Sequence, residues 1–175
     1  LTQVDANKTT VFVGPGTYQE NLTWPTKTAC RIVGLGRRGA VTISDASQGG
    51  TAVLNIAPGT AFGATMECWL ENLHISHKGT GIYIDDTDMA EKVIAYLDGI
   101  STNQDGGTSI LTQGGNAADA IRIYMQGDQH EIEGPIYLQL KNAGDHATLV
   151  LGGWAALLLG TGGQLRASLN EFIIF

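Results

Sequence analysis

Asp85, Asp86 and Asp88 form the densest carboxylate group in the chain, directly after the apolar residues 82–84. Clustered carboxylate oxygens are the ligands that Ca²⁺ prefers, and two carboxylates at a fixed separation can hydrolyse a glycosidic bond. The simpler interpretation is a polar corner in which Asp88 caps a short helix. We favour that corner, so the sequence assigns no catalytic, cofactor-binding or metal-binding residue here or elsewhere.

Two pairs of residues that contain histidine are also candidates for chemistry. His74 and His77 are three positions apart, and on a strand such residues point to opposite sides, which disfavours a shared metal ion. We expect His74 to face outward from a strand and His77 to begin a corner. Asp145 and His146 suit a hydrolase dyad, but no Gly-x-Ser-x-Gly segment accompanies them, and a solvated corner is preferred.

Charged and aromatic side chains offer two candidate ligand surfaces. Asp128, His130, Glu131 and Glu133 lie in the polar segment 126–133, which is either a rim that binds a sugar or a partner or, more often, a wet face. Six aromatic residues are candidate sugar platforms, although packing is the favoured role for them. They are Trp24, Trp69, Tyr83, Tyr124, Tyr137 and Trp154.

The elements that position these groups are short strands. Alternating or apolar segments end repeatedly at Gly, Asn, Asp or Pro, which is typical of strands between tight corners. They recur about every 20 residues, which predicts a stacked repeat fold with coils of that length. Helical signals are scarce, and only residues 86–96 predict a short helix. The expected strands cover residues 11–13, 22–24, 31–35, 41–44, 52–56, 68–76, 82–84, 93–100, 109–111, 120–125, 132–140, 148–151, 155–159 and 172–174.

The chain of 175 residues is long enough for one domain, and no linker divides it. We expect an all-β domain over residues 1–175, with residues 141–175 as a candidate non-solenoid segment used in oligomer contacts. Four side chains that follow a bend at Asn72 are expected to point inward: Leu73, Ile75, Ile82 and Ile84.

Composition limits the partners. The formal net charge is −7, which argues against nucleic acid because phosphate binding needs clustered Lys and Arg. The densest basic group, Arg31, Arg37 and Arg38, is interpreted as a solvated corner. The most apolar run, residues 155–159, is far shorter than the about 20 residues of a membrane span. No membrane partner is therefore expected.

The two cysteines, Cys30 and Cys68, form no CxxC or zinc-like spacing. Both stand beside apolar residues, so two buried thiols are the simplest interpretation. With coils of about 20 residues they are expected about two coils apart, at about 4.8 Å per coil, and a bridge between them would need unusual geometry.

The segment Pro-Gly-Thr-Tyr-Gln-Glu-Asn at residues 15–21, followed by Val-Gly-Leu-Gly at residues 33–36, resembles the pectin-lyase-like family of right-handed parallel β-helices. The resemblance covers residues 8–85 and is looser to the end of the chain. It implies a right-handed parallel β-helix in which the first segment is structural. The catalytic phrases of the family's methylesterases, polygalacturonases and pectate lyases have no counterpart in this chain.

The resemblance implies two classes of function. The first is a non-enzymatic structural protein of a phage or virus particle, such as a capsid decoration (cement), spike or fibre protein. Its expected partners are further copies of the chain, with a trimer as the expected form, and virion proteins such as the major capsid protein. The apolar, Gly-rich residues 152–163 are the expected contact surface. The alternative is a secreted lyase, hydrolase or esterase that acts on polysaccharides, or a carbohydrate-binding module. The missing catalytic phrases favour the non-enzymatic class, and no cofactor is expected.

Overall fold

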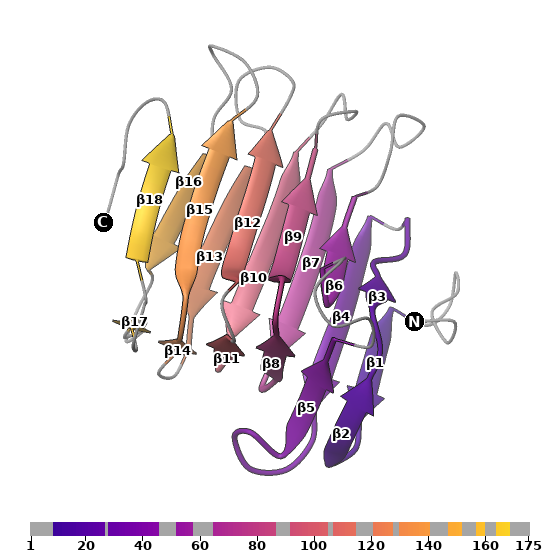
Figure 1. Cartoon of the computed structure of the whole chain (residues 1–175). Coiled ribbons are helices and arrows are strands. Elements are labelled where there is room, and N and C mark those ends of the chain that lie inside the picture. Colours follow the sequence, from indigo (N-terminus) through magenta and orange to yellow (C-terminus); the bar gives the residue numbers. More distant parts are fainter. Residues whose placement is uncertain are drawn as a thin grey trace.

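The computed structural model describes residues 9–26, 28–45, 52–57, 65–86, 92–104, 107–114, 121–127, 130–140, 147–151, 157–159 and 164–168. All regular structure in these residues is β, arranged as three six-stranded parallel sheets (Figure 1). Sheet 1 contains β1 (Thr10–Val13), β4 (Ala29–Gly34), β7 (Met66–Glu71), β10 (Val93–Asp98), β13 (Ile121–Gln126) and β16 (Ala147–Leu151).

Every coil takes one strand from each sheet in turn. Sheet 2 contains β2 (Gly16–Gln19), β5 (Val41–Ser44), β8 (His74–His77), β11 (Ser101–Gln104), β14 (His130–Ile132) and β17 (Leu157–Leu159). Sheet 3 contains β3 (Leu22–Thr23), β6 (Leu54–Ile56), β9 (Thr80–Asp85), β12 (Thr108–Gly114), β15 (Pro135–Leu140) and β18 (Gln164–Ser168).

Figure 1 shows the chain descending along sheet 1 at the rear and rising along sheet 3 at the front as it advances from β1 towards β18. This path is that of a right-handed parallel β-helix, and the fold predicted from the sequence is confirmed.

The coil is longer than predicted, at roughly 28 residues instead of about 20. Thr10 pairs with Arg31, 21 positions later, so the first coil is near the expected length. Arg31 then pairs with Trp69, 38 positions later, because the second coil carries long connections around β6. The sequence pattern marks strands but not the length of the connections that separate them.

Strand alternation decides which side chains fill the solenoid. Cys30, Cys68, Ala95, Ile123 and Leu149 follow one another in register along the inner side of sheet 1, and all five are buried. Each fully buried aliphatic side chain stabilises the fold by about 1.5–3 kcal/mol. Packing of these buried side chains against one another therefore holds successive coils together.

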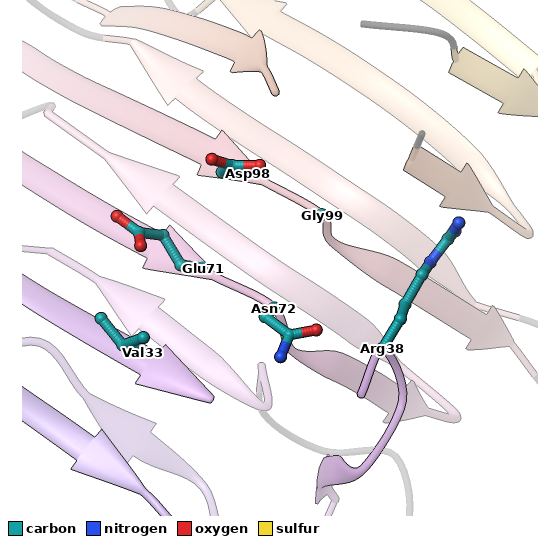
Figure 2. A pocket seen from close by; sticks show the side chains of 6 residues that line it. All are labelled: Val33, Arg38, Glu71, Asn72, Asp98 and Gly99. Atoms are coloured by element: carbon teal, nitrogen blue, oxygen red, sulfur yellow. The ribbon is translucent and has the colours of Figure 1, made fainter. Parts of the chain in front are cut away.

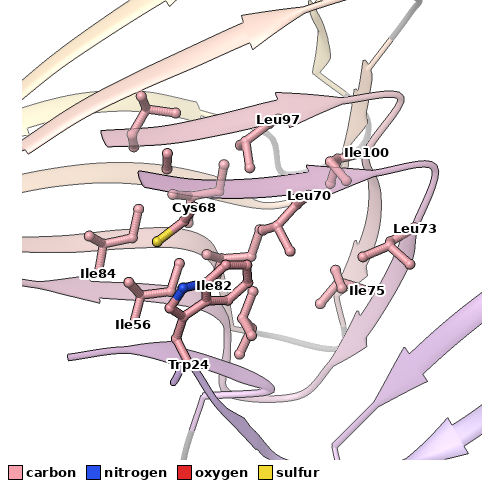
Figure 3. Close-up of a cluster of buried hydrophobic side chains, with 14 of the residues drawn as sticks. Trp24, Ile56, Cys68, Leu70, Leu73, Ile75, Ile82, Ile84, Leu97 and Ile100 are labelled. Carbon is pink, nitrogen blue, oxygen red and sulfur yellow. The ribbon is translucent and has the colours of Figure 1, made fainter. Parts of the chain in front are cut away.

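The predicted inward residues Leu73, Ile75, Ile82 and Ile84 are all buried, as expected (Figure 3). Trp24, 3% exposed, belongs to the same core, which confirms packing as its role (Figure 3).

The corner between sheets 1 and 2 uses a left-handed backbone conformation in three successive coils. Asn72 has φ 50°, and its counterparts Gly99 and Gly127 have φ 59° and 80°. The Asn72 side-chain amide donates hydrogen bonds to the carbonyl oxygens of Gly34, at 2.9 Å, and Gly36, at 3.0 Å. Asparagine tolerates this backbone region better than most side chains. The predicted bend at Asn72 is confirmed.

Two further sequence predictions are wrong. The expected helix at residues 86–96 is replaced from Val93 onward by strand β10, while residues 87–91 lie outside the described residues. Val93 and Ala95 are buried there with residues on either side half-buried, which is strand alternation. Cys30 and Cys68 are direct partners on adjacent coils, not two coils apart, because the coil between them is 38 positions long.

The solenoid extends into residues 141–175, since β16, β17 and β18 add one strand to each sheet. The expected strand at residues 172–174 and most of the apolar segment 152–163 lie outside the described residues, with β17 as the described part.

Candidate functional site

The outer face of sheet 1 carries a ladder of aromatic rings. Trp69, Tyr96 and Tyr124 are register partners on β7, β10 and β13, so their side chains project from the same column. The Trp69 and Tyr96 ring centroids are 3.9 Å apart with 16° between the planes. Those of Tyr96 and Tyr124 are 5.3 Å apart with 17° between the planes.

This stacking decides what the rings can bind. A sugar packs on the flat face of an aromatic ring, and Tyr96 has both faces turned to other rings. The main role of the ladder is therefore to join three coils to one another, and binding a ligand is secondary. Trp69 and Tyr124 are candidate sugar platforms only on the faces turned away from Tyr96.

Next to the ladder lies a pair of carboxylates that the sequence analysis did not single out. Glu71 and Asp98 follow Trp69 and Tyr96 by two positions, so they share the outer face and are register partners. They line a hollow of about 190 Å³ together with Val33, Arg38, Asn72 and Gly99 (Figure 2). Figure 2 shows the two carboxylates on neighbouring strands, with Arg38 on the turn that follows β4.

An arginine pairs with one of these acids, Glu71. The Arg31 Nη2 atom lies 2.6 Å from Glu71 Oε2 and 2.5 Å from Oε1. The hydrogen bond to Glu71 raises the pKa of Arg31. Arg38 Nη2 lies 3.6 Å from Glu131 Oε2. The basic group at Arg31, Arg37 and Arg38 is therefore divided, since Arg31 projects from a strand and the other two lie in a turn.

Backbone geometry fixes Asp98. A Cβ atom added at Gly127 would overlap the Asp98 carboxylate, so the acid occupies the space that a side chain would take on the next coil. The Asn72 backbone N–H donates to the Asp98 carbonyl oxygen at 2.8 Å. The two carboxylates lie on adjacent strands, which are about 4.8 Å apart in a sheet. The arrangement can bind a polyhydroxyl ligand or a cationic group of a partner.

Asp85 and Asp86, the first two members of the predicted acidic group, do not form a shared site. Asp85 lies on the outer side of β9 and accepts a 2.8 Å hydrogen bond from the Tyr83 hydroxyl. Asp86 is buried, at 1% exposure, on the opposite side. Burial, reinforced by Asp85, raises the pKa of Tyr83 well above its ordinary value. Asp88 lies outside the described residues, among which no three His, Cys, Asp or Glu side chains are placed to hold a metal ion.

His77 does not begin a corner as predicted; it ends strand β8 and is buried. Its Nδ1 is 3.1 Å from the Gly79 carbonyl oxygen, and its Nε2 is 3.3 Å from Ser109 Oγ. Ser109 donates to the Glu133 carbonyl oxygen at 2.5 Å and lies 2.9 Å from Thr102 Oγ1. A serine beside a histidine suggests nucleophilic catalysis, but Ser109 has no exposed surface for a substrate to reach. His77, Ser109 and Thr102 therefore form a hydrogen-bond network inside the solenoid.

His130 is also buried, with no exposed surface. Its Nδ1 accepts a hydrogen bond from the Ile100 N–H at 3.3 Å, and its Nε2 donates to the Gln126 carbonyl oxygen at 3.1 Å. These partners fit the neutral ring. Burial lowers the pKa of His130, and it does the same for His74 and His77. His74 Nδ1 lies 2.9 Å from Ser101 Oγ on the outer side of sheet 2, where the sequence placed it.

The remaining predicted residues divide into two groups. Tyr83, Tyr137, Glu131 and Glu133 are half-buried or exposed, which agrees with a wet outer face. The others lie outside the described residues: Asp128, Asp145, His146 and Trp154.

The acid pair had a detectable signal in the sequence. Trp-x-Glu at residues 69–71 and Tyr-x-Asp at residues 96–98 repeat an aromatic-x-acid pattern at an offset of 27 positions. Aligning the chain with itself at that offset would have placed both acids in one column.

Comparison with protein-family models, with curated proteins and with solved structures finds no match to this chain. Among the described residues there is no helix of the length and apolarity needed to cross a membrane. The features that bear on function are therefore the solenoid itself, the aromatic ladder and the acid pair on sheet 1.

Proposed function

We propose that this protein is a non-enzymatic structural component of a phage or virus particle, built as a β-helical decoration, spike or fibre module that assembles with further copies of itself and with other virion proteins. The particle context comes from the resemblance of residues 8–85 to pectin-lyase-like β-helices, of which many non-enzymatic members are virion parts. It is an argument from fold and not from a catalytic or binding motif.

The observation that carries the proposal is that the first coil has open strand edges and exposed apolar side chains. Among the described strands, β1, β2 and β3 at one end, like β16, β17 and β18 at the other, each have a neighbour on one side only. Such open parallel edges are templates for pairing with another chain. Phe12, 65% exposed, and Leu35, 44% exposed, lie on this end of the solenoid. Phe12 pairs in register with Val33, which precedes Leu35 by two positions, and these three residues are the patch that we propose for self-assembly.

The aromatic ladder supports the same role. A particle protein must keep its shape as an extended body, and stacked rings on adjacent coils resist bending and slipping between coils. Each stacked aromatic pair contributes about 0.5–1.5 kcal/mol beyond the area it buries. The ladder runs along the middle of sheet 1, on the third, fourth and fifth coils.

Self-assembly can be measured on the purified protein. Sedimentation velocity is expected to give a homo-oligomer, with a trimer as the expected form. Substituting both exposed residues of the patch, Phe12→Ser with Leu35→Ser, is expected to weaken the assembly at least tenfold. Gln19→Ser, at an exposed polar position of the same coil, is the matched control and is expected to leave assembly unchanged. A wild-type monomer at high micromolar concentration would contradict self-assembly.

A polysaccharide-active or carbohydrate-binding protein is the second candidate, and the hollow beside Glu71 and Asp98 favours it. Two carboxylates one coil apart, next to the outer face of the Trp69 ring, are the kinds of group that hold sugar hydroxyls and a sugar face. A glycan-binding screen with wild type and with Glu71→Gln plus Asp98→Asn separates the candidates. Binding or cleavage that the double variant abolishes would support this second function.

A further inference from the structure

We propose that Cys30 and Cys68 form a reversible disulfide bond that links the second coil to the third, and that a small-molecule disulfide such as oxidised glutathione installs it. This site is independent of the particle function proposed above. It concerns the two thiols of the chain, which are free in this structure.

Register brings the two thiols together. Cys30 on β4 and Cys68 on β7 are direct partners across a parallel strand pair. Directly paired residues on neighbouring strands have Cα atoms about 4.8 Å apart, inside the range of about 4.4–6.8 Å that disulfides span. Both side chains point into the solenoid, since both are buried on the inner side of sheet 1. No other residue separates them in the column.

Both thiols are buried in the folded protein, with Cys30 1% exposed and Cys68 0% exposed. Cys30 lies on the second coil, next to the first coil, whereas Cys68 lies one coil further along. A local opening at this end of the solenoid reaches Cys30 before Cys68. The proposed order of reaction follows: Cys30 meets the reagent first, and Cys68 resolves the intermediate.

The exchange balances without a further reactant. The Cys30 thiolate attacks one sulfur of the small disulfide, forming a mixed disulfide and releasing one small thiol. The Cys68 thiolate then attacks Cys30 Sγ, which forms the Cys30–Cys68 bond and releases the second small thiol. Two protons leave the protein thiols and are taken up by the two released thiolates. The protein is oxidised by two electrons, and the small disulfide is reduced by two.

The bond would close the longest coil. Cys30 and Cys68 are 38 positions apart, whereas the other coil-to-coil pairs of sheet 1 are 21 to 28 positions apart, as for Thr10 with Arg31 and Val93 with Ile121. Cross-linking a longer loop removes more conformational freedom from the unfolded chain. For a loop of this size in a chain of this length, the melting temperature is expected to rise by about 10 °C.

The rate of exchange depends on pH. Burial raises the pKa of both thiols, so both are protonated at neutral pH and only a small thiolate fraction reacts. As long as the pH is below the thiol pKa, each rise of one pH unit is therefore expected to speed up oxidation of the folded protein about tenfold.

The test incubates the folded protein with oxidised glutathione at pH 8.5, then quenches it with acid and measures thiols, intact mass and melting temperature. We expect both thiols to disappear, the mass to fall by about two hydrogens with no glutathione attached, and a digest to contain the linked Cys30 and Cys68 peptides. Dithiothreitol is expected to restore both thiols and the original melting temperature.

Cys68→Ala is the matched variant, because it keeps the thiol that reacts first and removes the resolving one. It is expected to show no rise in melting temperature under the same treatment. Two free thiols in the treated wild type, a stable glutathione adduct, or a disulfide between two chains would each overturn the proposal. Where Cys68→Ala fails to fold, the comparison of oxidised with reduced wild type decides the question by itself.

Discussion

Trp69 and Tyr96 stack across adjacent coils of sheet 1, with ring centroids 3.9 Å apart and 16° between their planes. Tyr96 continues the stack to Tyr124 on the following coil. The ladder is a consequence of register: one aromatic residue per coil in the same outward column places the rings face to face. Contacts between coils, and not contacts within one coil, hold this face of the solenoid together.

Removing the middle ring is expected to cost more than removing an end ring. Tyr96→Ala breaks two stacks and is expected to lower the free energy of unfolding by about 1–3 kcal/mol, whereas Tyr124→Ala breaks one and is expected to cost about half as much. Urea unfolding monitored by circular dichroism measures both. Equal losses for the two variants would mean that the rings contribute through burial and not through stacking.

The corner at Asn72 combines a left-handed backbone with two side-chain hydrogen bonds to the preceding coil. Asn72→Ala loses both and is expected to cost about 2–4 kcal/mol. Asn72→Gly keeps the backbone freedom and loses only the hydrogen bonds, so it is expected to cost about 1–2 kcal/mol. Chemical denaturation of the two variants separates the contributions, and a glycine variant less stable than the alanine variant would contradict this explanation.

Gly127 and Gly39 have similar positive φ angles, 80° and 73°, but different surroundings. A Cβ at Gly39 meets nothing within 4 Å, whereas one at Gly127 overlaps the Asp98 carboxylate. Gly39→Ala is expected to cost about 1 kcal/mol for the backbone alone, and Gly127→Ala is expected to cost at least about 1 kcal/mol more.

The extra cost at Gly127 is expected to depend on Asp98. In a double-mutant cycle, Asp98→Ala together with Gly127→Ala is expected to be more stable than the sum of the single changes predicts, because the overlap is gone. Additive losses would show that the acid does not occupy the space above Gly127.

Acid is expected to destabilise the fold through its buried histidines. Burial lowers the pKa of His130, His77 and His74 in the folded protein below the ordinary value of 6.5. Below about pH 6.5 these histidines bind protons in the unfolded chain but not in the folded chain. The free energy of unfolding therefore falls as the pH drops below 6.5, and the stability is fully present above pH 6.5.

His130→Gln tests this explanation at one residue. Glutamine retains an acceptor and a donor for the Ile100 N–H and the Gln126 carbonyl but does not titrate. The loss of unfolding free energy between pH 7 and pH 5 is expected to be smaller in the variant than in wild type. An unchanged pH dependence would show that His130 does not contribute to it.

Strand alternation made much of the fold predictable from sequence. The inward positions of Ile75 and Ile82 and the bend at Asn72 follow from local pattern and turn chemistry. The acid pair did not follow from the local pattern, because Glu71 and Asp98 become neighbours only through the coil length, and the repeat of Trp-x-Glu and Tyr-x-Asp marks them only when that length of 27 positions is used.

Polar residues inside the solenoid are the other feature that local pattern missed. Ser109 and His77 point inward although polar alternation usually marks the outer face, and their burial depends on hydrogen-bond partners supplied by other coils, such as the Glu133 carbonyl oxygen. His77 follows the inward-pointing Ile75 by two positions, so alternation along β8 puts it inside once the strand is known to extend to His77. Ser109 and its neighbour Ile110 are both buried, so alternation does not place Ser109.

The most direct test of the central claim is density-gradient fractionation of the native source, with this chain quantified by mass spectrometry in every fraction. The particle function predicts that the chain travels with intact particles at a fixed ratio to the coat protein, and that the ratio survives a second gradient. Recovery of the chain in the soluble fractions, free of particles, would contradict it.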